Sequence, residues 1–251
     1  EHVAALDYPK ERLEIQVLDD STDQTTVIIQ EIVTKLSAQG LAIAHIHRTD
    51  RTGFKAGALK AGLTQAKGEF IAIFDADFQP QSDWLLRSMP YFDDSKIGVV
   101  QTRWGHLNRQ ESILTRVQAF ALDLHFSLEQ MGRQASGVFM NFNGTAGIWR
   151  KSCIEDAGNW SGTTLTEDLD LSYRAQLKGW RIVYRPDIIT PAELPQTVQA
   201  ARGQQFRWNK GGAQNFKQLV RPLWRNPQIG LKEKLFGTAH LFSIDKNEIQ
   251  N

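Results

Sequence analysis

Two apolar runs in the first eighty residues each end directly on paired aspartates. Residues 15–18 precede Asp19-Asp20, and residues 70–74 precede Asp75-Ala76-Asp77. Short apolar runs of this kind predict buried parallel strands. Because open α/β sheets bind ligands beyond the carboxyl ends of their strands, both aspartate pairs are expected to face one crevice.

Strand and helix patterns alternate through the first hundred residues, which predicts an α/β fold with a doubly wound sheet flanked by helices. Strands are expected near 14–18, 41–47, 69–74 and 97–101, and helices near 24–38, 55–66 and 82–90.

The second half of the chain is expected to add helices to this sheet. Residues 110–131 read as a long amphipathic helix whose apolar stripe faces the core. An aromatic and glycine-rich stretch follows at 139–147, and beyond Pro222 the pattern weakens. The remaining predictions are helices near 150–157, 167–178 and 195–217, with a last strand near 181–185.

The length of the chain limits the number of domains, and its net charge limits the kinds of binding partner. A chain of 251 residues can bury one sizeable core, and we expect one catalytic domain over 1–221 followed by a C-terminal segment, 222–251. Its nucleotide half would span about 1–101 and its acceptor half about 102–221. With 29 basic and 28 acidic residues, the chain has no bulk attraction for nucleic acid. The single Cys153 predicts a reduced packing residue, and no apolar run reaches the roughly 18 residues of a membrane span.

Asp75 and Asp77 are the candidate metal ligands. An Asp-x-Asp turn after a strand offers two hard oxygen ligands that suit Mg²⁺ or Mn²⁺ held against a diphosphate. Aspartates are also common in ordinary turns, so this motif alone leaves the alternative open.

Asp19, Asp20 and Lys55 are the candidate nucleotide-binding residues. The two aspartates end the first visible strand, where a carboxylate can accept hydrogen bonds from a base or ribose. Lys55 lies among small residues at the next strand-to-helix junction and could meet a phosphate. The alternatives are that Asp20 or Ser21 caps a helix beginning near Asp23, and that Lys55 is a surface lysine.

Thr166-Glu167-Asp168 opens a predicted helix. Thr164 and Glu167 fit a capping box, which would explain Glu167 without catalysis. Asp168 is the candidate general base for an incoming hydroxyl. Since the helix dipole lowers the pKa of a carboxylate in the first turn, this role requires a desolvated or hydrogen-bonded setting.

The motif Gln204-Gln205-Phe206-Arg207-Trp208 places an anion-binding guanidinium beside a flat aromatic ring. Arg207 suits a diphosphate and Trp208 suits the face of a sugar. A structural helix with a solvated arginine is the alternative.

The motifs occur in a fixed order, and in that order the chain resembles glycosyltransferase family 2, within it the processive β-glycan synthases related to cellulose synthase. It is most similar to the plant-type glucomannan 4-β-mannosyltransferase branch, in longer strings at 17–23, 53–59, 74–80 and 142–150. The matching motifs are Asp20, Asp75-x-Asp77, Thr166-Glu167-Asp168 and Gln204-x-x-Arg207-Trp208.

The resemblance implies a GT-A fold, a GDP-mannose or UDP-glucose donor, a growing β-1,4-glycan as acceptor and inversion at the anomeric carbon. The implied roles are nucleotide binding for Asp19, Asp20, Lys55 and Asp75, metal binding for Asp75 and Asp77, catalysis for Asp168, Glu167 and Arg207, and acceptor binding for Trp208, Gln204, Phe142, Asn143, Gly144 and Thr145.

The chain departs from the family pattern at both ends. Relatives have an opening strand before residue 1 and membrane helices on both sides, so we expect a missing first strand and a membrane attachment through segments absent here. The implied location is the cytosolic face of the plasma membrane or Golgi, with the helix near 195–217 at the membrane surface. Two alternatives stay open: transfer of one sugar to a lipid such as a ceramide or diacylglycerol, and a non-catalytic nucleotide-binding fragment. A nucleotidyltransferase gives no reason for Gln204-x-x-Arg207-Trp208.

Overall fold

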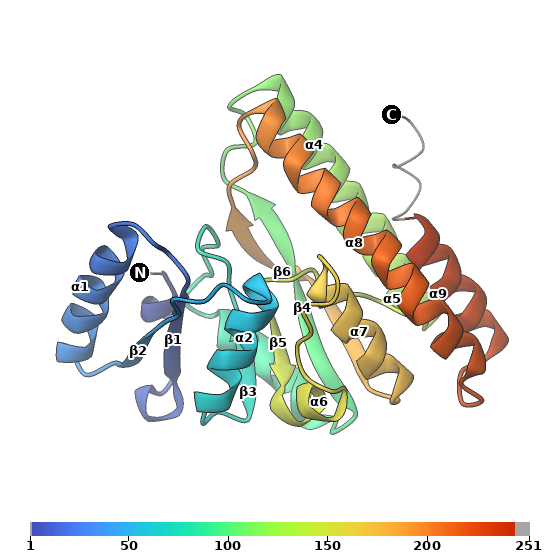
Figure 1. Cartoon of the computed structure of the whole chain (residues 1–251), viewed down its shortest axis with the longest axis horizontal. Coiled ribbons are helices and arrows are strands. Elements are labelled where there is room, and N and C mark those ends of the chain that lie inside the picture. Colours follow the sequence, from blue (N-terminus) through green and yellow to red (C-terminus); the bar gives the residue numbers. More distant parts are fainter. Residues whose placement is uncertain (1, 244–251) are drawn as a thin grey trace.

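The fold is seen in a computed structural model that describes residues 2–243 (Figure 1). β1 (Glu14–Asp19) pairs in parallel with β2 (Ala42–His47) to form a two-stranded sheet. A second sheet has the order β3-β5-β4-β6, in which β5 is antiparallel to both neighbours and β4 is parallel to β6. Its strands are β3 (Phe70–Ile73), β5 (Gly147–Arg150), β4 (Ile97–His106) and β6 (Arg181–Ala192).

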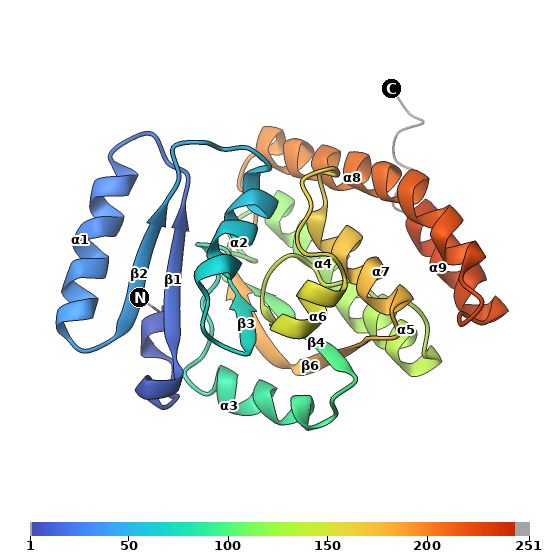
Figure 2. The same cartoon turned by 60° about the horizontal axis from the view of Figure 1, so that its bottom comes forward.

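Helices flank these sheets (Figure 2). In chain order they are α1 (Thr25–Ala38), α2 (Phe54–Gln65), α3 (Trp84–Ser88), α4 (Ile113–Leu124), α5 (Met131–Ser136), α6 (Lys151–Asp156), α7 (Glu167–Leu177), α8 (Val198–Arg225) and α9 (Leu231–Ser243). Short 3₁₀ turns span His2–Ala5, Lys10–Arg12 and Met89–Asp93, and a π-helical turn, His125–Gln130, joins α4 to α5.

The second sheet is buried on both faces. Successive side chains of a strand point to opposite sides, so neighbouring residues show what covers each face. Val99 and Trp149 pack into a cluster with residues of α2, α6 and α7. Val100 and Ile148, their neighbours in sequence, pack into another cluster with Trp84 of α3. This two-sided burial explains the continuous apolar run at the start of β4. The two sheets with their flanking helices confirm the expected mixed α/β architecture.

A cavity of about 1420 Å³ separates the two sheets. Its lining includes residues 15–18 of β1 and the whole of β3, and no ladder joins these two strands. The edge of each strand that faces the cavity therefore lacks a strand partner within residues 2–243. The gap therefore keeps β1-β2 and β3-β5-β4-β6 as two separate sheets.

The structure corrects the strand predictions in the second half of the chain. No strand was expected between the aromatic and glycine-rich stretch at 139–147 and the helix near 150–157, but residues 147–150 form β5, an inner strand of the sheet. β6 continues beyond residue 185 to Ala192, across a register irregularity between Thr102 and Arg103 of β4. Pro186 falls within this irregularity, where the missing N–H of proline does not interrupt a ladder.

The stripe expected to face the core on the helix at 110–131 faces outward, so that prediction is wrong. Ile113 is 76 % exposed, Phe120 64 % and Leu128 68 %. The buried side of this segment carries Thr115, Ala119 and Gln130, together with one large side chain of the core, Phe126. The spacing of the large apolar side chains correctly predicted an amphipathic helix, but the prediction that these side chains face the core was wrong.

The expected division at residue 221 falls inside α8, which runs through Pro222 to Arg225. α9 then packs back, and the Tyr173 hydroxyl donates to the Gly237 carbonyl at 3.1 Å. The part of 222–251 that the structure describes is thus joined to α7; residues 244–251 lie outside the described range. None of the described helices is long and apolar enough to cross a bilayer.

Candidate active site

A cavity of about 570 Å³ collects most of the residues singled out in the sequence. It lies between the end of β3, the start of α2, the start of α7 and the N-terminal half of α8. The predicted site residues that line it are Lys55, Asp75, Asp77, Asn143, Gly144, Glu167, Asp168, Gln204, Arg207 and Trp208. Segments as far apart in sequence as Lys55 and Trp208 therefore meet at one place, as the ordered motifs required.

The turn after β3 is fixed by hydrogen bonds on both sides. The Asp75 amide donates to the Thr145 hydroxyl at 2.8 Å. Lys55 pairs with the Asp75 carboxylate, and its Nζ also donates to the Gly144 carbonyl at 3.0 Å. Burial alone would lower the pKa of Lys55, but Asp75, with help from Glu167 and Asp168, raises it above its ordinary value. Lys55 is therefore a cation shared by the acidic groups of the cavity.

Asp168 has the desolvated setting that a general base at this position requires. Burial, followed by the negative charge of Glu167, raises the pKa of Asp168 to about 7. Burial also raises the pKa of Glu167, and it raises the pKa of Asp77, with smaller contributions from Asp75 and Glu193. A base whose pKa lies near the working pH is well suited to proton transfer.

Contacts with α8 position the start of α7. The Asn215 amide donates to the carbonyl and to the hydroxyl of Thr166, at 3.0 and 2.8 Å. A Cβ on Gly211 would lie 2.5 Å from the Thr166 hydroxyl, so only glycine permits this approach of α8. Thr166 is the N-cap residue and makes no side-chain cap, so the expected capping box of Thr164 and Glu167 is not formed. Glu167 faces the cavity instead.

Gly144 brings the main chain close to Asp168. Its φ of +83° lies in the left-handed region, and an added Cβ would be 3.0 Å from Asp168 Oδ2. Glycine supplies both the backbone conformation and the space for the carboxylate.

An aromatic wall forms one side of the cavity. The rings of Trp208 and Trp104 lie 6.5 Å apart between centroids, and Phe78 meets Trp104 edge-on at 5.3 Å. Trp104 lies near the end of β4 and was missed in the sequence, where it reads as an ordinary strand aromatic. Arg207 is exposed at the same cavity.

The stretch predicted to bind acceptor divides in two. Asn143 and Gly144 line the cavity, and the Asn143 side-chain nitrogen has no hydrogen-bond partner among the described residues. Phe142 is fully buried and packs edge-on against Trp149, so the expectation that its ring contacts a sugar is wrong. Thr145 is also buried, and its hydroxyl serves the Asp75 turn.

Asp20 lines the larger cavity, which is also lined by the Asp75-x-Asp77 turn. That cavity and the smaller one share Lys55, Asp75 and Asp77 in their linings, so Asp20 and Asp168 border adjacent cavities. The guanidinium of Arg48 pairs with both carboxylate oxygens of Asp20, with Nε 2.8 Å from Oδ1. Asp20 is therefore not the cap of α1. Arg48 was missed because nothing in its local sequence indicates a partner at the end of a neighbouring strand.

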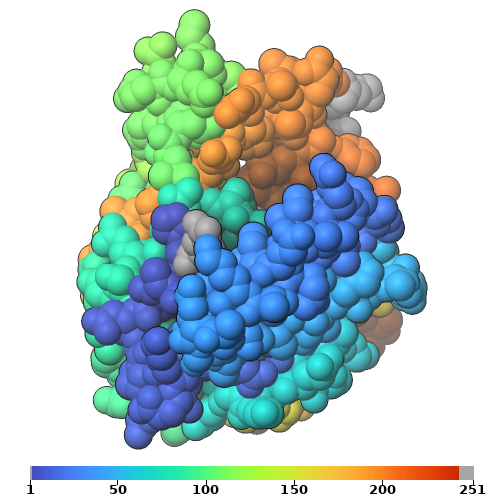
Figure 3. All heavy atoms as spheres, turned by 90° about the vertical axis from the view of Figure 1, so that its left-hand side faces the viewer, coloured from blue at the N-terminus to red at the C-terminus, as the bar shows by residue number. Residues whose placement is uncertain are grey.

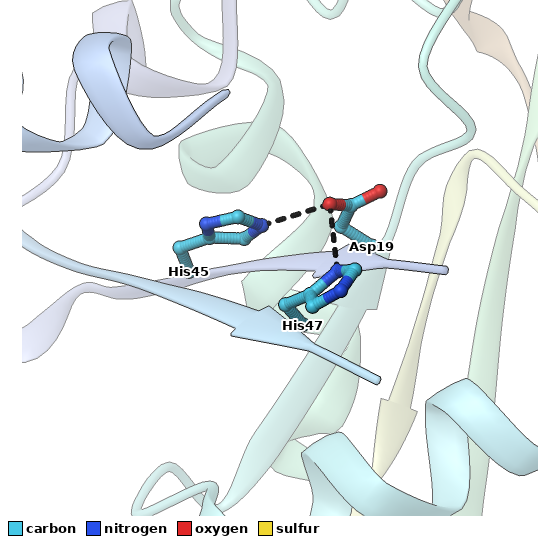
Figure 4. A group of neighbouring side chains, drawn as sticks. All are labelled: Asp19, His45 and His47. Carbon is cyan, nitrogen blue, oxygen red and sulfur yellow. Dashed lines mark hydrogen bonds and ion pairs between the residues drawn. The ribbon is translucent and has the colours of Figure 1, made fainter. Parts of the chain in front are cut away.

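Asp19 turns away from both cavities toward two histidines of β2 (Figure 4). Its Oδ2 lies 3.0 Å from His45 Nε2 and 3.1 Å from His47 Nδ1, and its Oδ1 accepts from the Ser21 amide at 2.8 Å. With these partners in place, nothing in the placement of Asp19 supports the predicted nucleotide contact. The alternating histidines of β2 were a signal that the sequence offered and that was not used.

Known proteins with similar sequences are glycosyltransferases. The family model described as glycosyltransferase-like family 2 matches residues 1–211. A probable glucomannan 4-beta-mannosyltransferase 11 of Oryza sativa subsp. japonica is 43% identical over 96% of this chain and 43% of its own length. Glucomannan 4-beta-mannosyltransferase 2 of Arabidopsis thaliana is 42% identical over 96% of this chain and 46% of its own length. The chain thus spans less than half the length of these relatives.

Solved structures share the fold at low sequence identity. A mannosyltransferase from Pyrobaculum calidifontis, in complex with GDP-Man and Mn²⁺, superposes with a TM-score of 0.70 at 20% identity, covering 97% of this chain and 68% of that one. S. aureus TarS 1–349 in complex with UDP-GlcNAc gives a TM-score of 0.70 at 16% identity, covering 98% and 67%. These similarities confirm the expected GT-A fold. Because the family model matches residues 1–211, which are most of the chain, the chain belongs to glycosyltransferase family 2.

Proposed function

We propose that the chain is the catalytic part of an inverting hexosyltransferase that moves a mannosyl or glucosyl residue from a nucleotide sugar to the 4-hydroxyl of a growing β-1,4-glycan. The observation that carries the proposal is the presence of Asp168, the Asp75-x-Asp77 turn and Arg207 around one cavity. A carboxylate that removes a proton and a guanidinium that meets a diphosphate are the two groups such a displacement needs.

In the proposed reaction the acceptor oxygen attacks the anomeric carbon while the bond from that carbon to the diphosphate oxygen breaks. Asp168 takes the proton of the acceptor hydroxyl, and the bonding electrons leave with the nucleoside diphosphate. Arg207, which lines the cavity, would meet the negative charge that develops on this leaving group. Attack from the side opposite the leaving group inverts the configuration, so an α-linked donor gives a β-linked product.

Asp75 and Asp77 would hold the Mg²⁺ or Mn²⁺ ion, and the cavity suits a cation. Five carboxylates line it, against two side chains from lysine and arginine, Lys55 and Arg207. A bound divalent ion would neutralise diphosphate charge. Lys55, which pairs with Asp75 in this structure, is placed to exchange that partner for a phosphate oxygen.

Asp20 would hold the nucleoside, with its carboxylate oriented by Arg48. The names of the relatives favour GDP-mannose over UDP-glucose as donor, as does the mannosyltransferase of the same fold that was solved with GDP-Man. Trp208 and Trp104 would present flat faces to the terminal sugar of the acceptor, with the unpartnered amide nitrogen of Asn143 as a donor to its hydroxyls.

The test is product analysis with the full-length enzyme in membranes. Incubated separately with labelled GDP-mannose and UDP-glucose, the enzyme should yield a polymer that linkage-specific β-1,4-hydrolases degrade. Asp168→Asn should abolish transfer while nucleotide binding persists. A product in which a lipid carries a single sugar would show that the acceptor is a lipid and not a glycan. Transfer that survives Asp168→Asn would remove the assigned base, and calorimetry without any metal-dependent binding of GDP or UDP would favour a non-catalytic domain.

We further propose that the outward face of α4 lies on a lipid bilayer, which concerns location and not chemistry. Figure 3 shows α4, in green, standing out beyond the nucleotide half. Its exposed stripe, which continues into the π-helical turn, would be costly in water and suits the boundary between head groups and acyl chains. The stripe consists of Ile113, Val117, Phe120, Leu124 and Leu128.

Flotation with liposomes tests this location. Val117→Glu together with Phe120→Glu should reduce co-flotation of the purified domain, whereas Val27→Glu on α1, which is also an exposed apolar position, should not. Equal flotation of the α4 variant and the wild type would exclude the stripe as the contact.

A further inference from the structure

Three side chains of metal-ligand type converge at the ends of β1 and β2, outside the candidate active site. Asp19 is paired with His47 in the strand register, and His45 lies two residues earlier on the same face of β2. One oxygen of Asp19, Oδ2, contacts both rings, and the three ligand atoms lie within 4.8 Å of one another (Figure 4).

Asp19 is a buried carboxylate whose charge needs compensation. Its side chain is 2% exposed, that of His45 5% and that of His47 31%, so the group opens toward solvent on the side of His47. Within residues 2–243 no lysine or arginine pairs with Asp19; the neighbouring Arg48 serves Asp20. The Ser21 amide donates to its Oδ1, and a cation beside Oδ2 would compensate the remaining charge.

The hydrogen bonds of Gln30 determine which nitrogen of His45 carries a proton. The Gln30 amide nitrogen donates to the Thr34 hydroxyl at 3.3 Å, which directs the amide oxygen to His45 Nδ1 at 3.1 Å. Nδ1 therefore bears the hydrogen, and in a neutral ring the lone pair of Nε2 points at Asp19 Oδ2. Two acceptors 3.0 Å apart repel unless a proton or a metal ion lies between them.

We infer that Asp19, His45 and His47 bind a divalent transition-metal ion, separate from the ion proposed for Asp75 and Asp77. A histidine that ligates a metal commonly donates its second N–H to a carbonyl oxygen, which is the part that Gln30 plays here. Two imidazole nitrogens with one carboxylate favour zinc or a similar first-row ion over magnesium. Ligand atoms in a tetrahedral zinc site lie roughly 3.3 Å apart, so the separations of 3.0 and 3.1 Å require little movement.

Such an ion would join β1 to β2 immediately before the loop that carries Asp20. Water, entering on the exposed side of His47, would complete its coordination. The ion would thus brace the nucleoside side of the larger cavity without taking part in the transfer reaction.

Metal titration of the full-length protein after chelation tests the site. Zinc should bind by calorimetry without nucleotide, and Co²⁺ should give the visible absorption of nitrogen- and oxygen-ligated cobalt in a site of low coordination number. His45→Gln and His47→Gln should each weaken zinc binding at least tenfold. Gln30→Ala, which removes only the outer hydrogen bond, should weaken it about tenfold. Zinc should raise the melting temperature of the wild type but not of His47→Gln.

Two controls separate this site from the others. His2→Gln alters an exposed histidine elsewhere, and Asp77→Asn alters the proposed catalytic metal site; zinc affinity at the β1–β2 site should survive both. The inference is overturned if zinc affinity and the cobalt spectrum are unchanged in both the His45 and the His47 variants while circular dichroism shows them folded. It is also overturned if the wild type binds no zinc, which would mean that a charged imidazole alone compensates Asp19.

Discussion

At the scale of single residues, the carboxyl group of Asp168 links structure to reaction most directly. Its raised pKa of about 7 results from burial and from Glu167. Only the ionised carboxylate can accept a proton, so activity should be lost as the pH falls through this value. We expect kcat/KM of the full-length enzyme to rise with pH up to about 7 and then level off.

A variant of Glu167 checks the cause of this shift. Glu167→Gln removes the neighbouring charge that helps to raise the pKa of Asp168, so the acidic limb of the pH profile should move to lower pH. A limb that stays in place would assign the rate-determining ionisation to another group. Asp168→Asn should leave no acidic limb, since any residual rate would lack the base.

Gly144 gives a second prediction at the residue scale. Gly144→Ala places a methyl group 3.0 Å from Asp168 Oδ2 and strains a backbone with a φ of +83°. We expect a stability loss of about 1–2 kcal/mol together with a large fall in kcat. Thermal unfolding and transfer assays measure the two effects. Gly132→Ala in α5 is the matched control, because its Cβ would meet nothing within 4 Å, and it should be neutral or slightly stabilising.

Sequence alone identified most of these residue types because carboxylates after apolar runs and an arginine beside a tryptophan are local patterns. Trp104 and Arg48 were not identified, since their roles come from partners that are distant in sequence: Trp208 for the first and Asp20 for the second. Phe142 was assigned to the ligand although it belongs to the core, because an aromatic beside glycine reads the same in both settings.

At the scale of elements, α8 determines where the catalytic turn lies. Gly211→Ala would bring a methyl group to 2.5 Å from the hydroxyl and 2.8 Å from the amide of Thr166. The turn must then shift and move Asp168, so we expect kcat to fall at least tenfold with KM for the donor nearly unchanged. The control is Gly203→Ala on the same helix, whose Cβ meets only the end of the Arg207 side chain at 3.8 Å. Equal losses in both variants would assign the effect to α8 as a whole.

Element predictions succeeded where periodicity was strong and failed where it did not determine a face or a partner. The ranges expected for α1, α2 and α7 match the structure within a few residues. β5 has four residues in a glycine-rich stretch, and its place between β3 and β4 comes from pairing that no local pattern reveals. For α4 the periodicity was right, but the choice of buried face depended on where the body of the protein lies.

At the scale of the whole molecule, two adjacent cavities with shared lining residues predict cooperative ligand binding. Asp20 borders one cavity and Asp168 the other, with Asp75 and Asp77 in both. A nucleoside diphosphate should therefore bind tightly only together with a divalent ion. We expect GDP with Mn²⁺ to raise the melting temperature of the full-length protein by more than the sum of the separate shifts. Asp77→Asn should abolish the additional shift, and purely additive shifts would contradict a shared site.

The gap between β1 and β3 has a consequence for this arrangement. Asp20 follows β1 and Asp75 follows β3, so the width of the gap sets the distance between the groups proposed to grip the two ends of the donor nucleotide. Polypeptide inserted there would act as a spacer, holding that distance constant and protecting the edge amides of both strands from hydrogen exchange. With the gap open, the lobe formed by β1, α1 and β2 could shift as a unit. The distance between Asp20 and Asp75 would then vary, and binding of the donor nucleotide would weaken while the rest of the fold stayed intact.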